Sequence, residues 1–157
     1  KKILGSGSYF YINNQHYLTN YTYFQFDFKI RTRQSGRLLE LNDLSGSTLT
    51  QSGYLHLDFD QNGIFTVYSN GYKYFSDENL TFNNLNKSII LKYTPDIYSP
   101  EVPDISLYYK SEGDLGYKKL RLAQGIQTYL TPTDISLKVF KDFNVDIGNF
   151  KIFNEDQ

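Results

Sequence analysis

Oxygen-bearing side chains recur at alternate positions from Asp58 to Gly63, which reads Asp-x-Asp-x-Asn-Gly. Oxygen ligands with this spacing open the calcium loop of EF-hands, where the glycine allows the sharp turn. That loop closes with a bidentate acid at its twelfth position, and here this position holds Ser69. We therefore interpret the segment as a strand that ends in an Asn-Gly hairpin turn.

Three further carboxylates, Asp43, Asp96 and Asp104, lie in segments that we expect to be loops. Hard oxygen ligands of this kind suit calcium, but carboxylates in loops are usually only hydrated. We therefore expect no cofactor and no metal. Calcium held at Asp43 and Asp104 is the alternative.

The residues for nucleophilic or acid–base catalysis are few, since the chain has two histidines and no cysteine. A Ser-His-Asp arrangement needs a histidine held by a carboxylate, and His56 shares a predicted strand face with Asp58. Jelly-roll glycosidases use paired carboxylates in a Glu-x-Asp-x-x-Glu pattern, which is absent, and Glu40 stands alone in the sequence. We predict that the protein is not an enzyme, with a glycoside hydrolase-like jelly roll as an alternative.

Aromatic residues make up 17% of the chain, which has 15 Tyr and 12 Phe but no Trp. Exposed tyrosine offers a flat surface and a hydroxyl, a combination that suits sugars and protein partners. Three tyrosines gather around a predicted hairpin at residues 68–74, and three others lie in or beside a loop at residues 95–103 that contains three prolines. The candidate ligand-binding residues are Asp43, Tyr72, Tyr74, Asp96, Tyr98 and Asp104.

The strands that must position these residues can be recognised by the alternation of apolar and polar residues along the sequence. Phe24, Phe26, Phe28 and Ile30 fall on one side of a two-residue period, and polar residues fall on the other side. This pattern is typical of a strand with one buried and one wet face. The predicted strands are residues 9–12, 23–31, 37–42, 54–60, 64–69, 72–75, 88–93, 105–109, 117–122, 135–140 and 149–153.

Many short strands separated by turn residues, with no convincing helical period, indicate an all-β fold. We predict an antiparallel two-sheet β-sandwich of the jelly-roll type, in which residues 1–157 form a single domain. Asn-Gly pairs at 62–63 and 70–71 predict tight turns. The predicted core includes Phe24, Phe26, Phe28, Leu39, Leu41, Leu55, Leu57, Phe59, Leu91, Leu107 and Leu137.

Bulk composition excludes some partners. The net charge of −1 argues against a general nucleic-acid binder, which would have a basic excess. No apolar run reaches the length of a transmembrane helix, so we expect no transmembrane segment here. Three Asn-x-Ser/Thr sequons, at Asn20, Asn79 and Asn86, would be glycosylation sites in a secretory pathway, although such triplets also arise by chance in an asparagine-rich chain.

The order of these segments resembles the laminin G-like domain, within the concanavalin A-like jelly rolls. Residues 24–39 are similar to the family's aromatic strand, Arg-Thr, glycine turn and Leu-Leu strand. Residues 53–68 are similar to its Tyr-Leu strand, Asn-Gly hairpin and return strand. Residues 146–154 resemble its closing strand, which in the family pairs near the N-terminal strand.

The chain also departs from the family pattern. Many members carry a cysteine pair near the C-terminus, and many carry a Trp-His where this chain has Asn86-Lys87. Calcium-binding members often place an aspartate before the Tyr-Leu strand, where this chain has Ser52-Gly53. The family's calcium site is therefore not carried over.

The resemblance implies a non-catalytic recognition domain that binds a glycan or a protein partner through rim loops. We expect these loops to be residues 42–53 and 95–104, in a module of a larger extracellular or cell-surface protein that has neighbouring domains. A structural module within a multidomain assembly is the first alternative to this function.

Overall fold

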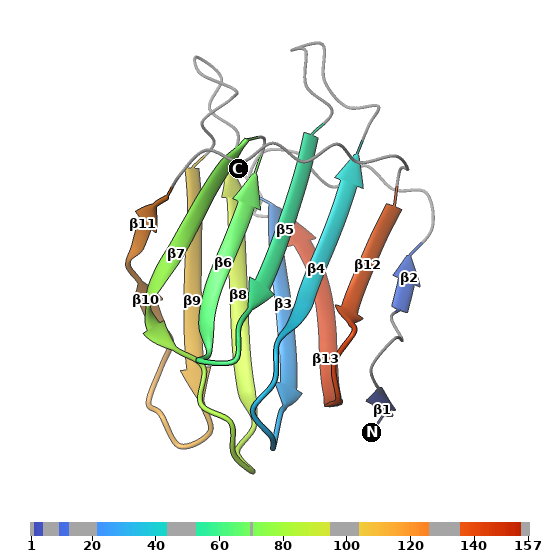
Figure 1. Ribbon diagram of the computed structural model, residues 1–157, viewed down its shortest axis with the longest axis vertical. Coiled ribbons are helices and arrows are strands. Elements are labelled where there is room, and N and C mark those ends of the chain that lie inside the picture. The colour runs from blue at the N-terminus through green and yellow to red at the C-terminus, as the bar shows by residue number, and fades with distance from the viewer. Residues whose placement is uncertain are drawn as a thin grey trace.

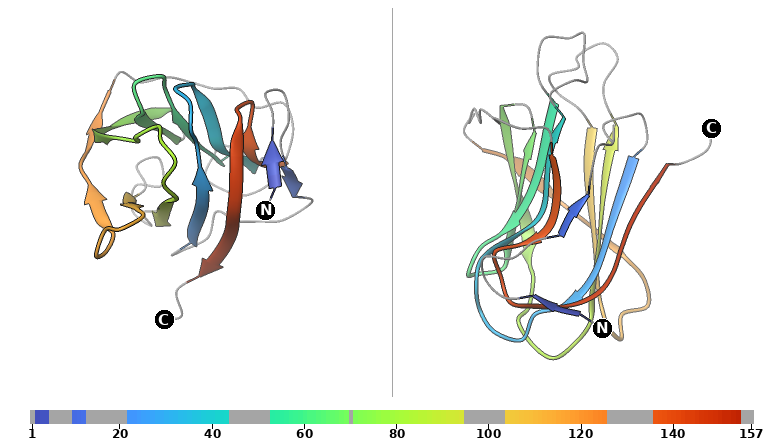
Figure 2. Two further views of the ribbon diagram at one scale, coloured as in Figure 1. Left: turned by 90° about the horizontal axis from the view of Figure 1, so that it is seen from below. Right: turned by 90° about the vertical axis from the view of Figure 1, so that its right-hand side faces the viewer.

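The computed structural model describes residues 2–4, 10–12, 22–43, 53–69, 71–94, 104–125 and 136–154. Within these ranges, the chain forms thirteen strands, which build two antiparallel sheets packed face to face (Figures 1 and 2). The predicted all-β, two-sheet sandwich is therefore confirmed. Across the same ranges, no helix has the length and apolar character needed to span a membrane.

One sheet has six strands, in the order β1-β13-β3-β8-β9-β10. The strands are β1 (Lys2–Leu4), β13 (Val145–Asn154), β3 (Thr22–Lys29), β8 (Lys87–Thr94), β9 (Asp104–Ser111) and β10 (Lys118–Leu120). The closing strand β13 lies between β1 and β3 and pairs with both. This pairing is the one that the family resemblance implied.

The other sheet has seven strands, in the order β11-β7-β6-β5-β4-β12-β2. The strands are β11 (Leu122–Gln124), β7 (Tyr72–Asn79), β6 (Ile64–Ser69), β5 (Gly53–Phe59), β4 (Gly36–Asp43), β12 (Ser136–Lys141) and β2 (Phe10–Ile12). Strands β4 to β7 pair in sequence order, as consecutive hairpins do.

At each side of the sandwich, two short strands that follow one another in the chain belong to different sheets. On one side, β10 pairs with β9 and β11 pairs with β7, with Arg121 between them. Asp77 fixes the backbone of Arg121 with two hydrogen bonds of 3.0 Å. The backbone N–H of Asp77 donates to the carbonyl of Arg121, and Asp77 Oδ1 accepts from the backbone N–H of Arg121. The prediction of one continuous strand over residues 117–122 is therefore wrong. On the other side, β1 and β2 are divided between the sheets in the same way.

The core lies between the sheets and follows the alternation seen in the sequence. Burial alternates strictly along β3 and along β8. Every residue of the predicted core is at most 2% exposed. Aromatic rings meet edge to face within it, as between Phe59 and Phe143, whose ring centroids lie 4.9 Å apart at 88°. The predicted core is therefore confirmed.

The Asn-Gly turn predicted at residues 62–63 joins β5 to β6. Asp60 Oδ1 accepts from the N–H groups of Asn62 and Ile64, at 2.8 and 3.0 Å. Gly63 has φ +80°, and a Cβ built there would lie 2.1 Å from the carbonyl oxygen of Leu80. The hairpin interpretation of this segment is confirmed, because Asp60 serves the turn.

Replacing Gly63 by alanine is expected to lower the free energy of unfolding by at least about 1–3 kcal/mol, because the left-handed backbone is strained and the new Cβ collides with Leu80. Urea unfolding followed by circular dichroism measures this loss. Gly113→Ala is the matched control, since Gly113 has φ +96° but open space around its Cβ position. Equal losses in the two variants would show that the contact with Leu80 contributes nothing.

Candidate functional site

The predicted rim residues that the structure describes lie at one end of the sandwich. Asp43 ends β4, Tyr72 begins β7 and Asp104 begins β9, and these strand ends lie at the top of Figure 1. The side chain of Asp43 lies outside the described part, as do Asp96 and Tyr98 entirely. Asp104 is exposed, and its strand position faces Thr94. A site formed by these rim residues stays a prediction.

Tyr74 differs from an exposed recognition residue because it packs against the core from the inner face of β7. Its strand partner is Val67, a core residue. Burial, with a smaller effect from Tyr72, raises the pKa of Tyr74. Tyr72 lies two residues away on the same face and is half-buried.

Among the described residues, no group of three or more histidines or carboxylates could hold a metal ion.

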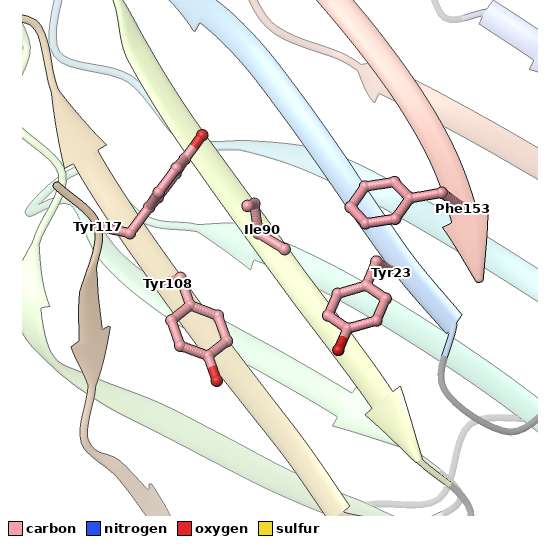
Figure 3. A pocket seen from close by; sticks show the side chains of 5 residues that line it. All are labelled: Tyr23, Ile90, Tyr108, Tyr117 and Phe153. Carbon is pink, nitrogen blue, oxygen red and sulfur yellow. The ribbon is translucent and has the colours of Figure 1, made fainter. Parts of the chain in front are cut away.

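The outer face of the six-stranded sheet carries an apolar hollow of about 400 Å³, which we call the aromatic groove (Figure 3). Its lining residues come from β3, β8, β9, β13 and the segment before β10. They are Tyr23, Ile90, Tyr108, Tyr117 and Phe153.

Strand alternation explains why these side chains point outward. Tyr23 is next to Phe24, and Ile90 is next to Leu91, so a core residue on the inner face forces its neighbour onto the outer face. In the register, Ile90 faces Tyr108, so the two side chains are cross-strand neighbours. A sheet face that would ordinarily be polar therefore presents a row of apolar residues.

The rings of the groove are ordered by one another and by two lysines. Tyr23 and Phe153 stack in parallel, with centroids 5.0 Å apart. The ammonium group of Lys92 lies 5.7 Å from the centroid of Tyr23, and that of Lys110 lies 5.9 Å from the centroid of Tyr117. Phe153 and Tyr117 remain 39% and 42% exposed, so their surfaces are accessible to a ligand.

A chain of hydrogen bonds runs from the groove along the sheet surface. Ser88 Oγ donates to Asp27 Oδ1 at 2.6 Å and lies 2.6 Å from the hydroxyl oxygen of Tyr117. Because a serine hydroxyl has one proton, the Tyr117 hydroxyl donates to Ser88. The oxygen of Tyr117 can then accept from a ligand. Gln25 Nε2 also donates to both oxygens of Asp27, at 3.3 Å each.

The turn between β9 and β10 holds Tyr117 in place. Glu112 Oε1 accepts from the backbone and side-chain N–H groups of Asn86, at 3.0 Å each, and the backbone N–H of Glu112 donates to the carbonyl of Asn86 at 2.8 Å. Ser111 and Asp114 close the turn with two further bonds of 3.0 Å. The position of Tyr117 is therefore fixed from both β8 and β9.

The outer face of the seven-stranded sheet is different, because it carries a network of charges around the buried Glu40, which we call the Glu40 cluster. Glu40 accepts from Arg37, Lys138 and Lys141, at 2.7, 3.3 and 2.8 Å. Arg37 also binds both oxygens of Asp58, at 2.7 and 3.1 Å. The sequence pattern did not identify these partners of Glu40. In the structure they come from β4 and β12.

The protonation state of Glu40 follows from this network. Burial alone would raise the pKa of its carboxyl group, but hydrogen bonds from Lys141 and Arg37 and the positive charges outweigh burial and lower the pKa to about 2. For Arg37, burial would lower the pKa, but hydrogen bonds and charge from Asp58 and Glu40 raise it. Both groups are therefore ionised at neutral pH.

His56 lies beside this cluster and is 5% exposed. Its Nε2 lies 2.7 Å from Asn42 Oδ1, an acceptor, so Nε2 carries a proton. Its Nδ1 is buried and has no hydrogen-bond partner among the described residues. Burial, helped by the charge of Arg37, lowers the pKa of His56 to about 3. Because an amide holds the ring, the described residues form no Ser-His-Asp arrangement.

Sequence reasoning noted Tyr108 as one of the tyrosines beside the proline loop, but its list of candidate ligand-binding residues contains none of the residues that line the aromatic groove. The signal was present, because Tyr23, Ile90, Tyr108 and Phe153 are apolar residues at positions where the strand pattern expects polar ones. No strand-period signal identified Tyr117, since it lies in a turn.

Comparison with known proteins adds no relative, since no protein-family model and no curated protein matches this chain. The candidate site therefore rests on the geometry of its own residues. The resemblance to the laminin G-like domain stays a proposal.

Proposed function

We propose that this domain is a non-catalytic recognition module that binds a glycan through the aromatic groove. The observation that carries the proposal is the row of exposed and half-buried rings beside the hydroxyl groups of Tyr117 and Ser88. A pyranose ring has flat C–H faces and a rim of hydroxyl groups, so it requires ring surface and hydrogen-bonding groups side by side. The groove supplies both.

The size of the groove supports a small ligand over a protein surface. Its volume of about 400 Å³ lies within the ~300–1,000 Å³ of ligand sites. A stable protein interface buries roughly 800 Å² on each partner. The five side chains that line the groove present a smaller surface than this. A stacked sugar needs only a hollow of this size to begin its binding site.

The Glu40 cluster supports a binding role over glycoside hydrolysis. A glycosidase needs one carboxyl group that stays protonated to serve as the general acid. The pKa of Glu40 is lowered to about 2, and Arg37 contacts both Glu40 and Asp58. An ionised carboxylate held by three cations is unsuited to proton donation.

The proposal includes the wider setting that the sequence suggested. A laminin G-like recognition module belongs in a larger extracellular or cell-surface protein, beside neighbouring domains. Rim residues such as Tyr72 and Asp104 begin their strands at the end of the sandwich where β13 finishes, and Phe153 is the residue before the last of β13. A ligand site that begins in the groove would extend toward this end of the sandwich.

Replacing Tyr108 by alanine is expected to weaken glycan binding at least tenfold, because the variant loses one of the four aromatic rings that line the groove. A glycan array first identifies bound structures with the wild-type domain, and isothermal titration calorimetry then measures the affinities. Phe75→Ala is the matched control, since Phe75 is a 36% exposed ring on the other sheet.

Two results would overturn the proposal. One is that no glycan on the array binds the wild-type domain, which would favour a structural module whose groove is buried against a neighbouring domain. The other is that Tyr108→Ala and Phe75→Ala lose affinity equally. Thermal unfolding of both variants separates loss of binding from loss of folding.

A further inference from the structure

A second hollow, of about 390 Å³, lies on the outer face of the same sheet, and we call it the polar pocket. Its lining includes Asp27, Ser88, Lys110, Ser111, Glu112 and Gly148. It contrasts with the aromatic groove because carboxylate, hydroxyl and ammonium groups surround it.

The two hollows are consecutive along the same strands. Ser88 lies two residues before Ile90 on β8, and Lys110 lies two residues after Tyr108 on β9. Because the two strands are antiparallel, both residues lie one outward step from the groove in the same direction. One such step is about 7 Å along a strand. The hydrogen bond between Tyr117 and Ser88 joins the groove to the pocket directly. A ligand that leaves the groove along the strands therefore enters the polar pocket.

A bulge in β13 opens the pocket. The register between β13 and β3 shifts between Ile147 and Asn149, and Gly148 occupies the bulge. A Cβ at Gly148 would lie 3.0 Å from the carbonyl oxygen of Asp27, closer than ordinary contacts allow. The glycine lets the bulge sit tightly against β3 and leaves no side chain over the pocket.

The pocket has unused hydrogen-bonding capacity of both kinds. Glu112 uses Oε1 for both bonds from Asn86, and its Oε2 has no partner among the described residues. The carboxylate of Asp27 accepts from Ser88 and Gln25 and retains further lone pairs. Lys110 supplies a donor above the Tyr117 ring. This combination suits hydroxyl groups. The two carboxylates are balanced by Lys110 and Lys87, which also lines the pocket, so the lining has no excess positive charge to attract an acidic sugar.

We infer that the glycan is a neutral oligosaccharide that spans both hollows, with one part stacked in the aromatic groove and a following sugar hydrogen-bonded in the polar pocket. This inference rests on the proposed function, since it names the ligand class of the same face. It predicts that affinity depends on chain length, and that Asp27 acts only on ligands long enough to reach it.

The test uses neutral cello-, xylo-, malto- and chito-oligosaccharides of one to six sugars, with a heparin hexasaccharide as the anionic probe. Titration calorimetry measures each with bacterially produced domain, so that Asn86, which also lines the pocket, is not glycosylated. At least one neutral series is expected to gain about tenfold in affinity between two and four sugars. Asp27→Asn, which keeps the side-chain size, is expected to remove that gain. Tyr108→Ala is expected to weaken every length.

The outcomes separate the two proposals. Neutral binding without a gain in affinity with length, an equal gain in Asp27→Asn, or tighter binding of the heparin hexasaccharide would overturn this inference and leave glycan binding intact. If none of the oligosaccharides binds, the inference is overturned, and array results decide glycan binding separately. Circular dichroism spectra and thermal midpoints of the variants exclude misfolding as the cause.

Discussion

Replacing Glu40 by glutamine is expected to lower the free energy of unfolding by about 2–4 kcal/mol. Glutamine keeps the size of the side chain but removes the charge that Arg37, Lys138 and Lys141 share. Glu40 is 8% exposed, and these cations are 17–27% exposed, so water screens their repulsion only partly. The expected loss is at the lower side of that for a fully buried pair because the lysines can still reach solvent.

Urea unfolding at pH 7 measures this loss. Glu78→Gln is the matched control, because Glu78 pairs with Lys118 at 2.9 Å in an exposed position and its removal should change the stability little. If Glu40→Gln unfolds at the wild-type urea concentration, the cluster contributes nothing to stability. If both variants lose the same amount, burial of the cluster does not matter.

The domain is expected to lose stability as the pH falls below about 6.5, because His56 resists protonation in the folded state. The pKa of His56 is about 3 in the folded chain, against an ordinary value of 6.5 for histidine. Between these values the unfolded chain binds a proton that the folded chain does not, so each unit of acidification favours unfolding by at most about 1.4 kcal/mol. Protonated Nδ1 would be buried beside Arg37, Lys138 and Lys141, with Glu40 as the one opposing charge identified there.

Glu40 adds to this effect at lower pH. Its pKa is lowered from 4.5 to about 2, so the stability that its charge contributes is present above pH 4.5 and is lost as the pH falls toward 2. His56 acts in the earlier part of the range, from about pH 6.5 downward. Both groups therefore make the domain acid-labile.

Unfolding curves between pH 7.5 and 4.5 test the contribution of His56. His56→Gln is expected to flatten the dependence of stability on pH, whereas His16→Gln, which removes the other histidine of the sequence, is expected to keep it. A wild-type slope in His56→Gln would contradict the prediction. The comparison of slopes holds even if His56→Gln lowers stability at pH 7.

The sequence predicted the faces of the strands better than their connections. The two-residue period assigns Phe24 and Leu57 to the core with no knowledge of their neighbours, because a strand alternates by geometry. It does not reveal that β13 lies between β1 and β3, since that order depends on contacts between distant segments. Leu120 and Leu122 seemed to continue one strand because both reach the core side, but they do so from different sheets.

The candidate sites show the same division. The sequence could indicate that Tyr108 and Ile90 face outward, but their meeting with Tyr117 depends on the sheet order and on a turn. Glu40 seemed isolated because its lysine partners follow it by 98 and 101 residues. The pairing of β4 with β12 brings these lysines to Glu40, and no local sequence pattern shows that these two strands pair.

The three-residue strands at the sides of the sandwich affect how readily two copies of the protein can pair their sheets in a concentrated solution. A long, flat outer strand offers a row of unpaired amides and carbonyls on which another copy can build an intermolecular sheet. Here the outermost strands of both sheets, β1, β10, β11 and β2, span three residues each. On one side the chain also turns from β10 to β11 through a backbone fixed by Asp77. Each of these outermost strands therefore offers a second molecule a template of only three residues.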